Sequence, residues 1–206
     1  PLGKRLRTVS NSLPRRRRLR VDWLTPASPR WSNALATARH DFYHLPAYAA
    51  VCADADGGAP GAIYIELDGD VCVWPLLERR IPDRAELDIT SPYGYPGPIF
   101  TPSSDARRRD LLQRGLPRVF EMLRARGDVT LFSRLHPILD AEVMAPGDAL
   151  PNLTVVEHGA TVSIDLRQPL TDSFAQYRET ARRHVRVARR YGFAVTHDEQ
   201  LTRLDD

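Results

Sequence analysis

The chain has 206 residues, of which 42% are hydrophobic and 27% are charged, with two cysteines and a formal net charge of +3 at pH 7. This length can bury one large core or two small ones, and two cysteines are too few for a disulfide scaffold or a structural zinc site, so we expect a globular fold with Cys52 and Cys72 in its core. No apolar run reaches the roughly 18 to 20 residues that span a bilayer, and the N-terminus lacks the apolar stretch of a signal peptide, so we expect a cytoplasmic protein without a transmembrane segment.

Positive charge is concentrated at the N-terminus. Residues 1–30 hold nine basic residues against Asp22 alone, a balance of +8, so the rest of the chain carries −5. The run Arg15–Arg18 could touch a phosphate backbone or an anionic membrane surface, but such runs are more often solvated tails. We therefore predict a basic disordered tail over residues 1–20 and a mildly acidic folded body, which does not indicate a nucleic-acid-binding domain.

A short strand and a helix open the body. Residues 21–24 are predicted to form the strand, and Pro26 and Pro29 mark a loop after it. Residues 45–55 are predicted to form a helix, because a proline suits its first position and apolar residues recur at helical spacing. A glycine pair, Gly57-Gly58, then ends this helix.

A hairpin and a third strand come next. The runs 62–67 and 71–77 read as strands, and Asp68-Gly69-Asp70 between them contains Asp-Gly, a strong signal for a tight hairpin turn. The third strand, residues 86–90, leads into a loop rich in glycine, proline and tyrosine.

Helices and strands alternate in the rest of the chain. Residues 105–126 are predicted to be helical, because Ser103-Ser104-Asp105 offers capping groups and apolar residues recur on one face, with a kink or break at Pro117. A last helix begins at Ser173-Phe174-Ala175-Gln176, which matches a capping box, and Gly192 ends it. Further strands are predicted at 129–133, 155–156, 160–166 and 193–196. These elements predict an α/β or α+β fold with a mixed sheet and helices between its strands.

The loop over residues 90–98, TSPYGYPGP, is the most informative segment for function. Glycine lets a backbone approach a ligand closely, proline holds the turn rigid, and tyrosine supplies a flat apolar face with a polar tip. The loop also precedes a helix N-terminus, which favours anions. It lacks the GxxxxGK[ST] and GxGxxG patterns, so nucleotide hydrolysis and nicotinamide redox chemistry are poorly supported. The alternative is a tight turn with packed aromatic side chains.

Arginines form one face of the last predicted helix. Arg178, Arg182 and Arg186 repeat at intervals of four, with Arg183 and Arg189 or Arg190 nearby. Guanidinium groups bind phosphate with paired hydrogen bonds, and their mutual repulsion at this density calls for an anionic partner or good exposure to water. A phosphate-binding face and a solvated basic face both fit the sequence.

Metal-binding and hydrolytic motifs have little support. His40, Asp41 and His44 lie close together but lack a clear fourth ligand, so we expect no metal. The other histidines are scattered, and no GxSxG elbow or activated cysteine provides a nucleophile. The carboxylates that could serve as a base are Asp165, Glu179, Asp198 and Glu199. Their spacing selects none of them, so the catalytic residues stay unknown.

Four features occur together in this order: Trp23, the DFYHLP sequence of residues 41–46, the SPYGYPGP sequence of residues 91–98, and the helix over residues 177–192 before a strand. Together they resemble the N-terminal half of the FemAB-like acyltransferases, which belong to the broader GNAT fold. The resemblance covers most of residues 21–200.

The family builds two GNAT-like modules in tandem. The resemblance therefore implies a first GNAT-like module over residues 21–166 and the start of a second, truncated module over residues 167–206. The chain also lacks an initiator methionine and stops at Leu204-Asp205-Asp206 just after a predicted strand, so we expect it to be a piece of a longer protein.

The resemblance implies an N-acyltransferase that moves an acyl or aminoacyl group from acyl-CoA or aminoacyl-tRNA to an amine. The acceptor would be a small-molecule or sugar-nucleotide-linked amine, with tRNA as a possible partner. The substrate-binding positions that it implies are Tyr93, Gly94, Tyr95, Gly97, Tyr177, Arg178, Arg182 and Arg186. The acetyl-CoA loop of simple GNAT enzymes, Q/R-x-x-G-x-G/A, is not visible, so either the donor binds in the missing C-terminal half or this module has lost donor binding.

Such a reaction needs no nucleophilic side chain. It rests on placing an amine against a carbonyl carbon, with backbone amides stabilising the oxyanion and a carboxylate or water accepting the proton. We expect the tyrosine loop and the arginine helix to meet at one cleft. The alternatives are a non-catalytic anion-binding module that docks a sugar nucleotide, RNA or partner through the same arginines, and a purely structural role for both segments.

Overall fold

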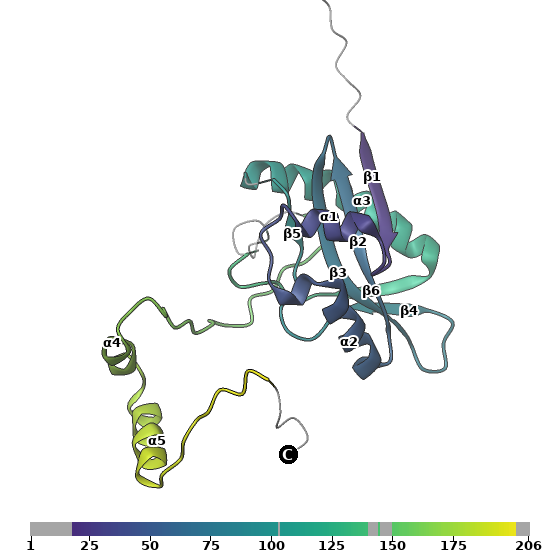
Figure 1. Ribbon diagram of the computed structural model, residues 1–206. Helices are drawn as coiled ribbons and strands as arrows, with labels where there is room; N and C mark the ends of the chain where they lie inside the picture. The colour runs from purple at the N-terminus through teal and green to yellow at the C-terminus, as the bar shows by residue number, and fades with distance from the viewer. Residues whose placement is uncertain (1–17, 103, 140–143, 145–149, 201–206) are drawn as a thin grey trace, which may run out of the picture. The chain divides into compact units, whose positions relative to one another are not determined.

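The computed structural model describes residues 18–102, 104–139, 144 and 150–200 (Figure 1). The chain divides into two compact units, the first of which ends at His158 and the second of which begins at Gly159. Of the predicted basic tail, residues 1–17 lie outside the described residues. The predicted C-terminal limit of the tail, residue 20, is wrong, because Leu19 and Arg20 already belong to the first strand.

The first unit is built on a mixed sheet (Figure 1). Its six strands are β1 (Leu19–Leu24), β2 (Ala59–Leu67), β3 (Asp70–Arg80), β4 (Leu87–Thr90), β5 (Ile99–Phe100) and β6 (Asp128–Phe132). The strand order is β1-β2-β3-β4-β6, and β5 pairs with β3. Among the described strands, β4 and β6 form a parallel pair and all other pairs are antiparallel. The expected mixed α/β architecture is confirmed.

Helices cover both faces of this sheet. The first unit contains α1 (Pro29–Leu35), the short 3-10 helix η1 (Phe42–His44), α2 (Pro46–Asp56) and α3 (Asp105–Arg126). On one face, the leucines of α3 pack against Ile63 and Ile65 of β2. On the other face, Trp31 of α1 packs with Ala62 and Tyr64, the alternate residues of the same strand. Because successive strand residues point to opposite faces, β2 supplies both halves of the core. Both cysteines are free and buried, as predicted.

The predicted hairpin is confirmed. Leu67 pairs with Asp70, so Asp68 and Gly69 form a two-residue turn. Both turn residues have positive φ, 54° and 95°, as a type I′ turn requires.

Two predictions for the first unit are wrong for reasons that involve proline. Pro29 does not lie in a loop but is the first residue of α1, where its missing N–H costs nothing. Of the predicted kink or break at Pro117, the break is wrong, because α3 runs continuously from Asp105 to Arg126. Burial of Leu112, Leu116 and other apolar residues on the same helix offsets the hydrogen bond that Pro117 cannot make. The predicted capping by Ser104 is also absent, since its side chain makes no cap hydrogen bond.

The second unit contains α4 (Leu170–Ala175) and α5 (Glu179–Arg190) instead of one helix. The predicted capping box is wrong, because Ser173 lies inside α4 and the N-cap of α5 is Arg178. No helix in the described part of the chain is both long and apolar enough to cross a bilayer.

Strands predicted in the C-terminal third of the chain are not formed. Residues 155–156, 160–166 and 193–196 have no regular structure, and Val162 and Leu166 are about nine-tenths exposed, at 91% and 90%. A strand needs a neighbour to take up its backbone N–H and C=O groups. The described residues provide no such neighbour to these segments. Most of their apolar side chains therefore stay in water, and Val155, which packs partly against the core of the first unit, is the exception.

Candidate functional site

The tyrosine loop, residues 91–98, begins where the parallel pair of strands ends. Thr90 of β4 is paired with Phe132 of β6, and the next residue, Ser91, donates its backbone N–H to the Phe132 carbonyl at 2.9 Å. A second contact joins the residue after β6 to the central strand β3, because the indole N–H of Trp74 in β3 donates to Ser133 Oγ at 2.8 Å. Ligands of open α/β sheets bind beyond the carboxyl ends of parallel strands, so the loop has the position that a binding segment would take.

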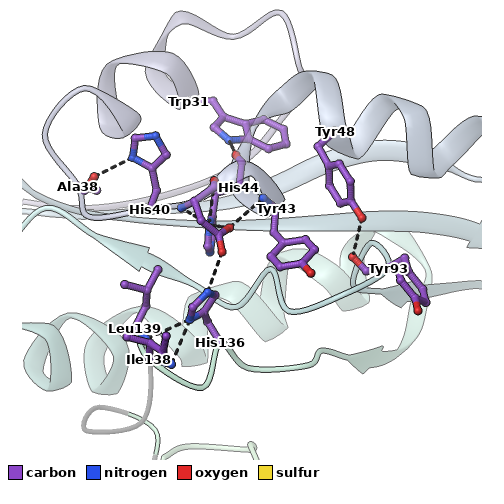
Figure 2. A network of polar contacts seen from close by, with 11 residues as sticks. Trp31, Ala38, His40, Tyr43, His44, Tyr48, Tyr93, His136, Ile138 and Leu139 are labelled. Carbon is purple, nitrogen blue, oxygen red and sulfur yellow. Dashed lines mark hydrogen bonds and ion pairs between the residues drawn. The ribbon is translucent and has the colours of Figure 1, made fainter. Parts of the chain in front are cut away.

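The loop rests on an aromatic cluster formed by Phe42, Tyr43 and Tyr48. The ring centroids of Phe42 and Tyr43 are 4.1 Å apart, and the Tyr48 ring lies 5.1 Å from Phe42 and 5.5 Å from Tyr43. The Tyr48 hydroxyl donates to the Tyr93 carbonyl at 3.2 Å (Figure 2). Burial, with smaller contributions from a hydrogen bond to Cys52 and from neighbouring tyrosines, raises the pKa of Tyr48 to about 12. Tyr48 therefore keeps its proton at neutral pH and holds the loop as a donor.

Gly94 explains how the loop packs on this cluster. Its φ is +89°, and a Cβ at this position would lie 2.2 Å from Cε1 of Tyr43. Only glycine lets the backbone lie against that ring in this conformation. The flanking side chains point outward, since Tyr93 is 73% exposed and Tyr95 is 43% exposed. Gly97, the other predicted glycine, is buried. Of the predicted loop residues, Gly94 and Gly97 are therefore buried, whereas the side chains of Tyr93 and Tyr95 are accessible to solvent.

A link between Asp41 and His136 joins two distant parts of the first unit. Asp41 Oδ1 accepts the backbone N–H of Tyr43 at 2.9 Å, and Asp41 Oδ2 lies 2.8 Å from His136 Nε2 (Figure 2). On the other side of the ring, His136 Nδ1 accepts the backbone N–H groups of Ile138 and Leu139 at 3.1 and 3.2 Å. Because Nδ1 accepts, Nε2 carries the proton and donates to the carboxylate. Both ring nitrogens are therefore engaged, so this pair positions the chain and is not a free base.

His44 forms the buried end of the same network. Its side chain is fully buried, its Nδ1 accepts the Asp41 backbone N–H at 3.2 Å, and its carbonyl accepts the Trp31 indole N–H at 2.9 Å (Figure 2). Burial lowers the pKa of His44, although the Asp41 carboxylate acts in the opposite direction. The ring is therefore neutral at pH 7.

The three residues considered as metal ligands, His40, Asp41 and His44, do not converge, because His40 Nδ1 instead faces the Ala38 carbonyl at 2.9 Å.

The arginine helix, α5, belongs to the second unit, and two of its predicted binding residues are already paired. Glu179 binds both Arg182, at 2.8 Å, and Arg186. These contacts, with the Arg186 hydrogen bond the largest cause, hold the pKa of Glu179 below its usual value. Arg182 also donates to the Ala175 carbonyl at 3.1 Å, and Tyr177 packs against Phe174 at a centroid distance of 5.7 Å. The arginines without a partner in the described second unit are Arg178, Arg183, Arg189 and Arg190.

The tyrosine loop lies in the first unit and the arginine helix in the second. Their meeting at one cleft stays a prediction.

Sequence reasoning found the loop but missed the Asp41–His136 link. The two residues are 95 positions apart, and nothing in the local sequence pairs them. The spacing of Asp41 and His44 did carry a signal, because an acceptor three residues before a second polar side chain is a capping pattern, and both capping contacts are made.

Comparison with models of known protein families, with curated proteins and with solved structures found no match. The family resemblance therefore rests on the sequence motifs alone.

Proposed function

We propose that the chain is an N-acyltransferase of the FemAB-like type, in which residues 21–166 form a GNAT-like module and residues 167–206 begin a second one. It would transfer an acyl or aminoacyl group from acyl-CoA or aminoacyl-tRNA to an amine. The observation that carries the proposal is the position of the tyrosine loop: it follows the carboxyl end of β4 in a parallel pair, with its backbone fixed and two tyrosine rings exposed.

In this proposal the tyrosine loop binds the acceptor. An ammonium group is attracted to the face of an aromatic ring, and Tyr93 and Tyr95 present such faces to solvent. The bound ammonium group must lose a proton, and the resulting neutral amine then attacks the carbonyl carbon of the donor. Asp41 and His136 are engaged with each other and Tyr48 keeps its proton. The chain's contribution is therefore to hold and orient the reactants, and water or a carboxylate accepts the proton.

The arginines of α5 would bind phosphate groups of a sugar-nucleotide-linked acceptor or of tRNA. The available ones are Arg183, Arg189 and Arg190 of α5 and Arg178 at its N-cap, since Arg182 and Arg186 are paired with Glu179. Paired hydrogen bonds from a guanidinium group to a phosphate are strong and directional. Both proposed donors are cytoplasmic molecules, so the proposed reaction belongs in that compartment.

Incubation of the chain with radiolabelled acyl-CoA or charged tRNA and a panel of amines tests the proposal. We expect label to appear on an amine, and the rate to fall at least tenfold in a Tyr93→Ala variant, as for loss of a positioning contact. Phe193→Ala is the matched control, because Phe193 is also an aromatic residue, is equally exposed, at 75%, and lies outside both the loop and α5. Absence of transfer to every amine by folded protein contradicts the proposal.

A second candidate is a non-catalytic module that docks a sugar nucleotide, RNA or an anionic partner. The unpaired arginines of α5 support it directly, because a cationic helix binds polyanions without any chemistry. Binding that weakens steeply as salt rises, with no turnover in the labelling assay, would favour this candidate over the enzyme.

A further inference from the structure

A small pocket in the first unit lies next to the Asp41–His136 link, because two of its lining residues, Ile138 and Leu139, donate their backbone N–H groups to His136. Its volume is about 100 Å³. The residues that line it are Arg39, Pro98, Ile99, Phe100, Arg108, Ile138 and Leu139. A single water needs about 10 to 15 Å³, whereas pockets for drug-sized ligands begin near 300 Å³. The pocket therefore has room for one small chemical group, not for a whole cofactor.

Arg108 is a fixed donor in this pocket. Its Nε donates to the Pro102 carbonyl at 2.7 Å, its Nη1 donates to Asp105 Oδ1 at 3.1 Å, and its guanidinium carbon lies 6.0 Å from the centre of the Phe100 ring. Its side chain is only 20% exposed. A guanidinium group has five N–H donors, so the contacts to Pro102 and Asp105 leave the remaining ones for a ligand.

Arg39 provides the second cation. It lies two residues before Asp41, is exposed, and has no ion-pair or hydrogen-bond partner among the residues that the structure describes. Asp105 is the carboxylate paired with Arg108, so two guanidinium groups face this region against one direct carboxylate partner. Two other lining residues are held in place, because His136 Nδ1 accepts the backbone N–H groups of Ile138 and Leu139.

We propose that this pocket binds a phosphoryl group, with Arg39 and Arg108 as its ligands. Arg108 is largely buried, and a charge-assisted hydrogen bond to such a guanidinium group is stronger than one made in bulk water. A carboxylate presents two oxygens in one plane, which a single guanidinium group can satisfy. A phosphoryl group presents three acceptor oxygens and up to two negative charges, which suits two guanidinium groups from separate segments. The proposal does not depend on acyl transfer.

Calorimetric titration of the full chain at low ionic strength tests this, with inorganic phosphate, methyl phosphate and acetate as separate probes. We expect a saturable phosphate site that Arg39→Ala weakens at least tenfold, since charge-assisted hydrogen bonds are lost. Arg39 is exposed, so this variant should fold normally. Arg108→Lys should weaken the same site, because it keeps the positive charge but loses the planar set of guanidinium donors.

Arg107→Ala is the matched control. Arg107 precedes Arg108 in the same helical turn, but its guanidinium binds Asp70, at 2.7 Å from Nε, and it does not line the pocket. Phosphate binding should be unchanged in this variant. Tighter binding of inorganic phosphate than of methyl phosphate would identify the free ion as the ligand, and similar binding of both would identify a phosphate ester.

Several results would overturn the proposal. One is phosphate binding that survives Arg39→Ala unchanged, which would place the site elsewhere, such as on α5. Another is an equal loss in the Arg107→Ala control. Binding of acetate as tight as that of phosphate, or no saturable binding of phosphate at all, would also overturn it.

Discussion

Replacement of Gly94 by alanine tests how the tyrosine loop is held. A non-glycine residue at the φ of this position, +89°, costs about 1 to 2 kcal/mol in backbone strain. The new Cβ would also lie 2.2 Å from Cε1 of Tyr43. That ring cannot retreat freely, because Phe42 packs 4.1 Å away, and overpacking of this kind costs about 1 to 3 kcal/mol. We therefore expect Gly94→Ala to lower the free energy of unfolding by about 2 to 5 kcal/mol.

Denaturant unfolding followed by tryptophan fluorescence measures this loss, since Trp31 and Trp74 are fully buried. Gly57→Ala is the matched control. Gly57 also has a positive φ, +69°, but a Cβ there would meet no atom within 4 Å. Gly57→Ala should therefore show only the backbone cost of about 1 to 2 kcal/mol.

A double-mutant cycle separates the two parts of the cost. In a Tyr43→Ala background the ring is gone, so Gly94→Ala should cost no more than Gly57→Ala does, and the coupling energy should equal the overpacking part. The reasoning is refuted if Gly94→Ala is as mild as Gly57→Ala in the wild-type background. It is also refuted if the cost of Gly94→Ala is the same with and without the Tyr43 ring.

Three further predictions concern other contacts. Burial lowers the pKa of His44, so the unfolded state takes up its proton first, and stability should fall as pH drops below about 6.5, by at most about 1.4 kcal/mol per pH unit. His44→Gln should reduce this slope in unfolding experiments between pH 7.5 and 5, and an unchanged slope argues against the assignment. Ser133→Ala leaves the Trp74 indole N–H without its acceptor and should cost about 1 to 3 kcal/mol in denaturant unfolding; a loss too small to measure contradicts it. For RNA binding, Arg190→Ala should lower the slope of the logarithm of the binding constant against the logarithm of salt concentration by about 1. Arg182→Ala should change this slope less, because its guanidinium is already ion-paired with Glu179. Equal changes in the two variants contradict the pairing.

The parts of the fold that were predicted correctly are specified by neighbouring residues. The hairpin depends on Asp68 and Gly69, and the limits of α3, Asp105 and Arg126, follow from its apolar periodicity and the glycine after it. α1 was missed because Pro29 was interpreted as a loop residue, although proline suits the first position of a helix. β5 is two residues long, too short to show any alternation.

The unformed strands show a different limit of sequence reasoning. The alternation of Val162, Ile164 and Leu166 indicates which face of a strand would be covered, but not whether a partner is present to cover it. Strand formation depends on that partner as much as on the segment itself.

The candidate site was predictable only in its local part. The composition of the tyrosine loop indicated an unusual backbone, and Gly94 has one. The surface on which it rests could not be predicted, because Tyr43 and Tyr48 contact the loop across about fifty residues of sequence. The pairing of Glu179 with Arg182 and Arg186 was predictable from the sequence, because residues three and seven positions apart lie on the same face of a helix.

The Asp41–His136 link also bears on the order in which the molecule folds. Closing a loop becomes more costly in entropy as the loop lengthens, and this contact closes one of 95 residues. Asp41 comes before β2 and His136 comes after β6, so the hairpin, β4 and α3 all lie between them. During synthesis, a nascent chain can therefore make this link only after every strand of the sheet has been synthesised.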